Sequence, residues 1–157
     1  MIKRSGNLGA GLAIVLMMAA GLAQAQEDAE ASLYDRLGGL PPISVVVSDF
    51  IDVLVVDDVL NANPAIDETR QRVPAPYLKY RVTSLVCQAA GGPCEYQGRS
   101  MQASHAHLNI TEAEWAQMVS LLEGVLDEHG VPDRETEELL AIVGSTKEDI
   151  VTVWDES

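Results

Sequence analysis

Basic residues are scarce in this sequence of 157 residues. It contains 10 Lys and Arg against 24 Asp and Glu, which gives a formal net charge of −14 at pH 7. A surface of this sign repels the phosphate backbone of nucleic acids and the headgroups of anionic lipids. We therefore expect neither a nucleic acid nor an anionic membrane surface as a partner.

The motifs of most hydrolases and zinc enzymes are also missing. The sequence has no H-E-x-x-H, no G-x-S-x-G and no cluster of cysteines. Only two cysteines occur, Cys87 and Cys94, with Gly-Gly-Pro between them. That tripeptide can turn the chain back, so a disulfide can form in an oxidising compartment. One buried and one exposed thiol is the alternative, which the sequence leaves open.

Long apolar runs are absent except at the N-terminus. Lys3 and Arg4 precede an apolar stretch over residues 8–23, and Ala-Gln-Ala ending at residue 25 has the pattern of a cleavage site. This order predicts a secretory signal peptide, with an uncleaved membrane anchor as the alternative. We expect export, to a bacterial periplasm, and no membrane association after cleavage. The expected parts are a signal peptide at 1–25, an acidic tether at 26–31 and one domain at 32–157.

The rest of the chain predicts an all-α domain. Apolar residues from Ile43 to Leu54, and again from Leu78 to Ala89, recur at the spacing of one helical face. Thr111 and Glu114 have capping-box spacing at the start of a third helix, which Gly130 ends. A last helix is expected from about Pro132 to Ile150, and no strand is predicted. We expect a turn over residues 61–64, Asn-Ala-Asn-Pro, and a solvated acidic helix face formed by Glu135, Glu137 and Glu138.

Two of the three histidines lie close together. His105 and His107 are two residues apart, so on a helix they point in nearly opposite directions and cannot easily bind one metal ion together. Met101, one turn before His105, makes the side of His105 the apolar one. A single inward histidine cannot hold zinc, whereas a haem needs only one protein ligand. The alternative is a hydrogen-bonded core histidine. His129, just before Gly130, can meet free carbonyl groups at a helix end.

A series of motifs in the sequence resembles the group 1 truncated haemoglobins. It runs through Leu-Tyr-Asp-Arg-Leu-Gly-Gly at 33–39, Ser-Asp-Phe at 48–50, Gly-Gly-Pro at 91–93, and Tyr-Gln-Gly-Arg-Ser-Met at 96–101 before His105. The resemblance extends from about Ser32 to about Val151. It implies a truncated globin-like two-over-two helical sandwich that holds one haem b per chain, with His105 as the proximal iron ligand. No C-x-x-C-H motif for covalent attachment is present.

The same resemblance implies which residues surround the haem. The helix of Phe50 and Ile51 and the helix of Leu78, Arg81 and Val82 correspond to the distal wall. Arg81 could bind the ligand or a haem propionate, or could lie at the surface with its charge in water. The full expected set around the haem is Phe50, Ile51, Leu78, Arg81, Val82, Met101 and His107.

The chain departs from the family pattern on the distal side. Ile51 stands where a tyrosine usually follows the phenylalanine, and Leu78 and Val82 occupy positions where a polar residue is common. A phenylalanine that commonly wedges the haem is absent near Asn63-Pro64. These changes predict a nearly apolar pocket, from which oxygen should dissociate fast. Carbon monoxide and nitric oxide depend less on a hydrogen-bond donor.

The expected function is the binding of diatomic gases (O2, CO, NO) at haem iron, with oxygen binding or carriage as the family-level description and an unidentified electron donor. One alternative is a periplasmic haem enzyme that acts on nitric oxide, nitrite or peroxide. A second alternative is a haem-free helical interaction module, which the missing tyrosine and phenylalanine would suit.

Overall fold

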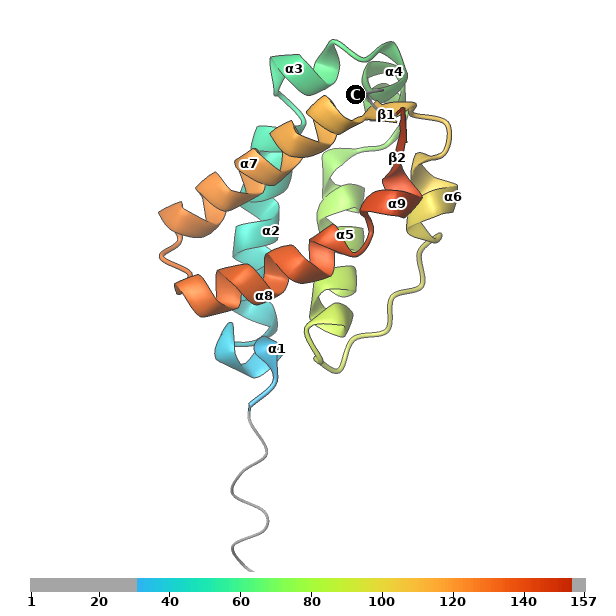
Figure 1. Ribbon diagram of the computed structural model, residues 1–157. Helices are drawn as coiled ribbons and strands as arrows, with labels where there is room; N and C mark the ends of the chain where they lie inside the picture. The colour runs from blue at the N-terminus through green and yellow to red at the C-terminus, as the bar shows by residue number, and fades with distance from the viewer. Residues whose placement is uncertain (1–30, 154–157) are drawn as a thin grey trace, which may run out of the picture. The chain divides into compact units, whose positions relative to one another are not determined.

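A computed structural model describes residues 31–153 of the chain. The predicted signal peptide over 1–25 lies outside the described residues, as do residues 26–30 of the predicted tether and residues 154–157. No helix within 31–153 is long and apolar enough to cross a membrane. The helices and strands in chain order (Figure 1) are α1 (Leu33–Arg36), α2 (Leu40–Leu54), α3 (Asp58–Asn61), α4 (Pro64–Arg72), α5 (Ala75–Ala89), α6 (Met101–His105), β1 (Ile110–Thr111), α7 (Glu112–Glu128), α8 (Asp133–Gly144), α9 (Lys147–Ile150) and β2 (Val151–Val153).

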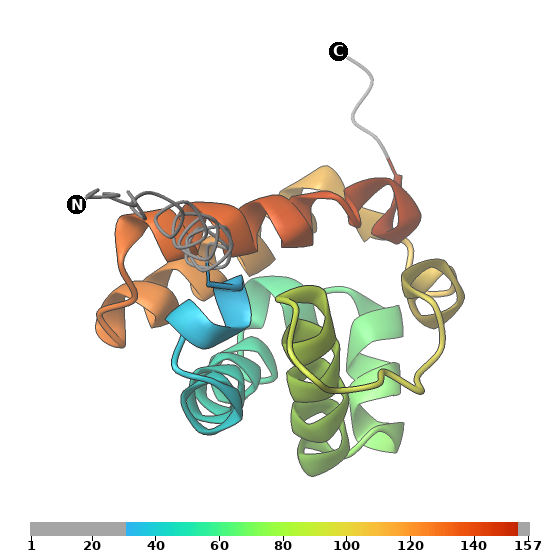
Figure 2. The same ribbon diagram turned by 90° about the horizontal axis from the view of Figure 1, so that it is seen from below.

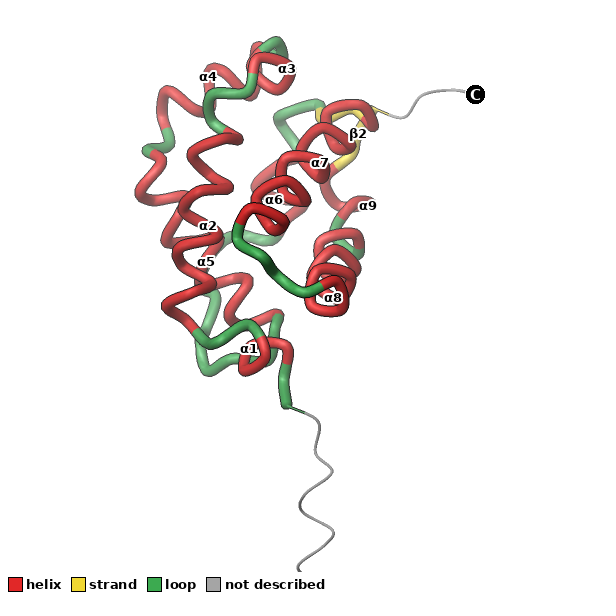
Figure 3. Tube along the Cα trace, turned by 90° about the vertical axis from the view of Figure 1, so that its left-hand side faces the viewer, coloured by secondary structure: helices red, strands yellow, loops and turns green. Residues whose placement is uncertain are grey.

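The four long helices form two layers. Helices α2 and α5 lie side by side in one layer, and α7 and α8 form the other (Figures 2 and 3). The layers meet where α7 packs on α2. The expected two-over-two helical sandwich is therefore confirmed, and the short helix α6 lies beside α9 at one end of the second layer.

Burial of branched aliphatic side chains holds α2 against α5. Pro41 and Pro42 occupy the first turn of α2, where a missing N–H costs little. Ile43, Val47 and Ile51 then lie on one face and are buried. Each such side chain contributes roughly 1.5–3 kcal/mol when it leaves water. The half-buried residues that α5 packs against this face are Ala75, Leu78, Val82 and Val86.

Helix α7 begins and ends where the sequence predicts. The side chain of Thr111 accepts a hydrogen bond from the amide of Glu114 at 3.1 Å, and the Glu114 carboxylate accepts one from the amide of Thr111 at 2.7 Å. This is a complete capping box. Gly130 follows the helix with φ of 62°, a conformation that favours glycine at a helix end.

The structure joins Cys87 and Cys94 in a disulfide, with 5.7 Å between their Cα atoms. Cys87 lies near the end of α5, so the bond anchors the loop that leads from α5 to α6. Gly92 in this loop has no room for a side chain, because a Cβ would lie 2.8 Å from the carbonyl oxygen of Cys87 and 2.4 Å from the ring of Tyr34. The turn therefore depends on glycine at that position.

Two expectations about the C-terminal part are wrong. The chain contains a short parallel strand pair, β1 with β2, in which Ile110 is opposite Val151. Both residues are buried in one apolar cluster, which stabilises an extended backbone there. The last helix is also interrupted, and at the break the hydroxyl groups of Ser145 and Thr146 donate to carbonyl groups of the preceding turn at 2.6 and 2.7 Å. Helix α8 ends at Gly144 and α9 is a separate turn.

The expected turn over residues 61–64 is present between α3 and α4, and its last two residues also begin helix α4, a helix that the sequence pattern does not predict. The side-chain oxygen of Asn63 accepts a hydrogen bond from the amide of Ala65 at 2.9 Å, and Pro64 occupies the first helical position. Both are ordinary signals of a helix start. The prediction missed the helix because α4 contains no buried residue and so lacks an apolar repeat.

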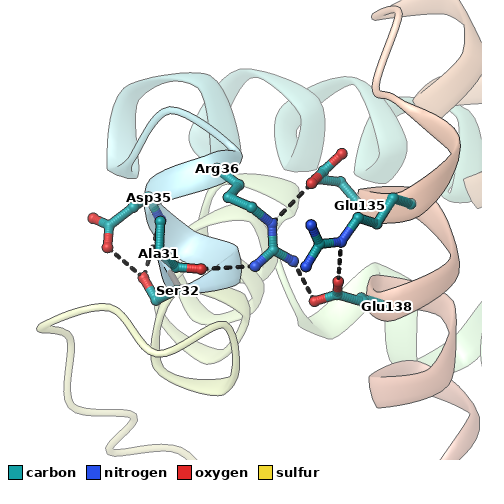
Figure 4. A network of polar contacts seen from close by, with 7 residues as sticks. Ala31, Ser32, Asp35, Arg36, Glu135 and Glu138 are labelled. Atoms are coloured by element: carbon teal, nitrogen blue, oxygen red, sulfur yellow. Dashed lines mark hydrogen bonds and ion pairs between the residues drawn. The ribbon is translucent and has the colours of Figure 1, made fainter. Parts of the chain in front are cut away.

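The expected solvated face of Glu135, Glu137 and Glu138 is also partly wrong. Glu135 is buried, with 7% of its surface exposed, and accepts a hydrogen bond from Nε of Arg36 at 2.8 Å. Arg36 also binds the carboxylate of Glu138, which lowers the pKa of that group (Figure 4). Arg36 on α1 thus compensates the buried charge on α8. Glu137 is exposed as expected.

Candidate functional site

His105 is the last residue of α6, a helix of five residues. The hydroxyl of Ser100 caps this helix by accepting a hydrogen bond from the amide of Ala103 at 3.1 Å. Nδ1 of His105 lies 2.8 Å from the carbonyl oxygen of Met101. A carbonyl only accepts, so Nδ1 carries the proton and donates it. The other ring nitrogen, Nε2, is then a bare acceptor, and no hydrogen bond within residues 31–153 engages it.

The surroundings of His105 also favour a neutral ring. Burial lowers the pKa of the half-buried imidazole, and the nearby His107 lowers it further, while the bond to the Met101 carbonyl opposes this shift. The neutral form keeps the lone pair on Nε2 at pH 7. An imidazole whose Nδ1–H is held by a backbone carbonyl has the orientation that a metal-ligating histidine needs.

His107 and Met101 differ from His105 in their exposure and in the residues that they contact. His107 is exposed, and its Nε2 lies 3.4 Å from the hydroxyl of Thr69 on α4. Met101 is half-buried and packs against the apolar cluster that includes Trp115 and Ile150. The two histidines therefore make their contacts with different elements.

The predicted distal residues come together between α2 and α5. Ile51, with 3% of its surface exposed, packs with Val47 in the cluster that Phe50, Leu78 and Val82 border. All five side chains are apolar. This wall contains no hydrogen-bond donor from those positions.

Arg81 lies beside two exposed aromatic rings of α5. Its guanidinium carbon is 5.0 Å from the ring centre of Tyr77 and 5.6 Å from that of Tyr80, a cation–π arrangement. Its Nε atom is buried and has no hydrogen-bond partner within the described part of the chain. Arg81 therefore has a donor without a partner, on the same helix that carries Leu78 and Val82.

A cavity of about 440 Å³ lies between the two layers. Of the predicted site residues, Phe50 and Val82 line it, whereas His105 does not. This space is not predictable from the sequence, because its lining residues have the same helical spacing as core residues. The other apolar lining residues include Val46, Val86, Leu122, Leu126, Leu139 and Val143.

These features fit a haem better than a bare metal ion. Residues 31–153 contain no group of three His, Cys, Asp or Glu side chains that could hold a metal, so an iron at His105 needs ligands from elsewhere. A porphyrin supplies four nitrogens. Helix α5 has only one buried residue, Cys87, so most of its apolar side chains are incompletely covered. Helix α6 packs chiefly against α9. The free Nε2, the uncovered apolar face and the unused Arg81 donor all suit such a group.

Comparison with known proteins agrees with this geometry. A model of the bacterial-like globin family matches residues 32–152. The chain belongs to the bacterial-like globins. A group 1 truncated haemoglobin from Mycolicibacterium paratuberculosis is 28% identical over 131 residues, which are 83% of this chain and 92% of the relative. Another from Chlamydomonas moewusii is 24% identical over 78% of this chain and 69% of its own length. The expected resemblance to this group is thereby confirmed.

Solved structures share the fold of this globin. The truncated haemoglobin from Tetrahymena pyriformis in its Fe(III) form aligns with a TM-score of 0.68 at 21% identity, over 77% of this chain and 98% of the other. The 2/2 haemoglobin from Synechococcus sp. PCC 7002 aligns with the same score and coverage at 24% identity. Membership of a globin family implies haem-based binding of small gases.

Proposed function

We propose that this globin holds one haem b through His105 and binds diatomic gases reversibly, oxygen among them. The observation that carries the proposal is the imidazole of His105, whose Nδ1 is held by the Met101 carbonyl at 2.8 Å while Nε2 has no partner within residues 31–153. When bound, a haem supplies an iron with a coordination position for a gas molecule.

Each part of the site has a distinct role in this proposal. Nε2 of His105 would hold the iron, and the hydrogen bond from Nδ1 to the Met101 carbonyl fixes the ring plane and would increase the basicity of the ligand. The half-buried Leu78 and Val82 of α5 supply apolar surface for the macrocycle. The guanidinium of Arg81, whose Nε has no hydrogen-bond partner within residues 31–153, would suit a haem propionate, because guanidinium and carboxylate form strong charge-assisted hydrogen bonds.

The apolar distal wall sets the selectivity that we expect. Ile51, Leu78 and Val82 carry no hydrogen-bond donor, so a ligand that becomes polarised gains little stabilisation from them. Oxygen should therefore dissociate fast, whereas carbon monoxide should be retained well. The cavity beside Phe50 and Val82 is lined mostly by apolar side chains, with Arg36 and His129 also in its wall, and should admit neutral gases.

We also propose that the globin acts outside the cytoplasm. The N-terminal order of basic, apolar and small residues supports a signal peptide over residues 1–25. The disulfide between Cys87 and Cys94 supports an oxidising compartment, in which such bonds persist. Mass determination of the protein secreted by its host would show whether the chain begins near Gln26.

Titration of the haem-free protein with haem tests the proposal. We expect a Soret band that saturates at one haem per chain and, after reduction, an oxygen dissociation rate much faster than that of carbon monoxide in stopped flow. A protein that shows no saturable Soret change would contradict the haem proposal. Slow oxygen dissociation would contradict only the role given to the apolar wall.

A further inference from the structure

Asn63 connects the start of α4 to the loop that follows His105. Its Oδ1 accepts the amide of Ala65 at 2.9 Å, which caps α4. Its Nδ2 donates to the carbonyl oxygen of Leu108, also at 2.9 Å. One side chain therefore serves two backbone segments that lie 45 residues apart in the sequence.

A second hydrogen bond continues this connection to His105 itself. The amide of Leu108 donates to the carbonyl oxygen of His105 at 2.8 Å, and Leu108 is buried. Leu108 therefore links the two residues: its carbonyl accepts from Asn63, and its amide donates to the carbonyl of His105. The turn that ends α6 is fixed from outside by a side chain of another element.

Helix α6 depends on such external contacts. It has five residues, none of them buried. A helix of this length is unstable by itself in water. Its neighbours are α9, which packs against it, and the loop held by Asn63. A change at Asn63 should therefore be felt at the orientation of the His105 ring.

The segment around α4 also contacts the end of α2. Nδ2 of Asn61 donates to the carbonyl oxygen of Val55 at 3.3 Å, and the guanidinium of Arg70 donates to the same oxygen. Ile66 packs against the cluster that contains Leu108. Residues 61–72 therefore join the end of α2 to the loop behind the proposed iron ligand.

We propose that Asn63 is a positioning residue, which orients His105 toward its metal by fixing the turn at Leu108. This inference rests on the proposed haem function for its consequence at the iron. Its first part, that Asn63 holds the turn after α6, is a property of the polypeptide alone and is testable without haem.

Asn63→Asp separates the two roles of the side chain. Aspartate keeps an oxygen that caps α4 about as well as asparagine does, but it has no donor for the Leu108 carbonyl. In the full-length haem-free protein, hydrogen exchange at the amides of residues 104–108 should become about tenfold faster, while exchange in α4 stays unchanged. Asn61→Asp, which removes the neighbouring bond to Val55, is the matched control and should leave residues 104–108 protected.

The ferrous haem-loaded protein supplies the second readout. Asn63→Asp should shift or broaden the iron–histidine stretching band in resonance Raman spectra and speed haem loss several-fold, whereas Asn61→Asp should leave the band in place. A loss of general stability alone would not move that band.

Unchanged exchange over 104–108 in Asn63→Asp would overturn the inference. If Asn63→Asp speeds hydrogen exchange over residues 104–108 but leaves the iron–histidine band in place, the proposed role of Asn63 in orienting His105 would be overturned. A wild-type protein that binds no haem would instead overturn the proposed function, and the exchange result would still decide the structural part.

Discussion

The α2–α5 pair and the α6 segment form the two parts of the candidate site, and they are held in place by different contacts. Helix α2 has 15 residues and buries Ile43, Val47 and Ile51 against α5. Helix α6 has five residues and buries none. Its geometry depends on packing against α9, on the hydroxyl of Ser100, which accepts a bond from the amide of Ala103, and on Asn63, which donates to the carbonyl of Leu108.

This difference predicts how each part responds to change. Many dispersed apolar contacts tolerate a single substitution of similar volume, although removal of volume is costly. A few hydrogen bonds hold a short helix only while each bond is present. The distal wall should therefore determine stability and gas selectivity, whereas the α6 segment should determine haem attachment.

The largest stability effect is expected in the α2–α5 pair. Ile51→Ala removes a side chain with 3% exposure and should lower the free energy of unfolding by about 2–5 kcal/mol. Val53→Ala, on the exposed side of the same helix, should cost less than about 1 kcal/mol. Urea unfolding of the haem-free variants measures both. Equal losses would show that burial against α5 does not hold α2.

Removal of the disulfide should have a smaller effect on the same scale. The double variant Cys87→Ala and Cys94→Ala releases a short loop and should lower the unfolding free energy by about 2–3 kcal/mol. Wild-type protein unfolded with and without dithiothreitol provides the matched comparison, because the variant should no longer respond to the reductant. If the stability of the double variant still changes with dithiothreitol, the effect of the reductant does not come from the Cys87–Cys94 disulfide.

A donor placed in the distal wall should change gas selectivity more than stability. Val82→Gln brings an amide to the apolar cavity, and one hydrogen bond of about 1–1.5 kcal/mol should slow oxygen dissociation about tenfold. Carbon monoxide dissociation should change less than twofold. Val82→Leu controls for volume and should leave the oxygen rate fast. Stopped-flow mixing of the reduced protein measures these rates.

The smallest effect is expected from the protonation of His105. Burial lowers the pKa of this imidazole below its ordinary value of about 6.5. Between the folded and the unfolded pKa values the unfolded chain binds more protons, so the haem-free protein should lose stability as the pH falls below about 6.5. His105→Gln should remove this contribution. Urea unfolding at several pH values measures this difference. If the wild type and His105→Gln show the same pH dependence of stability, groups other than His105 cause it.

Helix positions were predictable from the sequence where an apolar face repeats along one segment. Such local repeats identified α2, α5 and α7, and the capping box and Gly130 located both ends of α7. Helix α4 has no buried residue, so its only local signal in the sequence is the cap, Asn63 followed by proline. The same residues also form the turn between α3 and α4, so the pattern alone does not separate a turn from a helix start.

The missed features depend on contacts between distant residues. Glu135 is buried because Arg36, 99 residues earlier, supplies a compensating charge. The pairing of Ile110 with Val151 likewise joins segments that no local pattern connects. At the candidate site, the family resemblance of the sequence predicts His105 and the apolar distal positions. It gave no indication that Asn63 contacts Leu108, because the geometry of that bond comes from the folded chain.

Rescue by free imidazole tests the central claim most directly. His105→Gly removes the proposed ligand and leaves a space for an exogenous one, with His107→Gly as the matched control. We predict that His105→Gly loses its stoichiometric haem spectrum and regains it when millimolar imidazole is added, while His107→Gly binds haem like the wild type. A His105→Gly variant that keeps the wild-type spectrum without imidazole, or a His107→Gly variant that loses it, would contradict the assignment of His105 as the iron ligand.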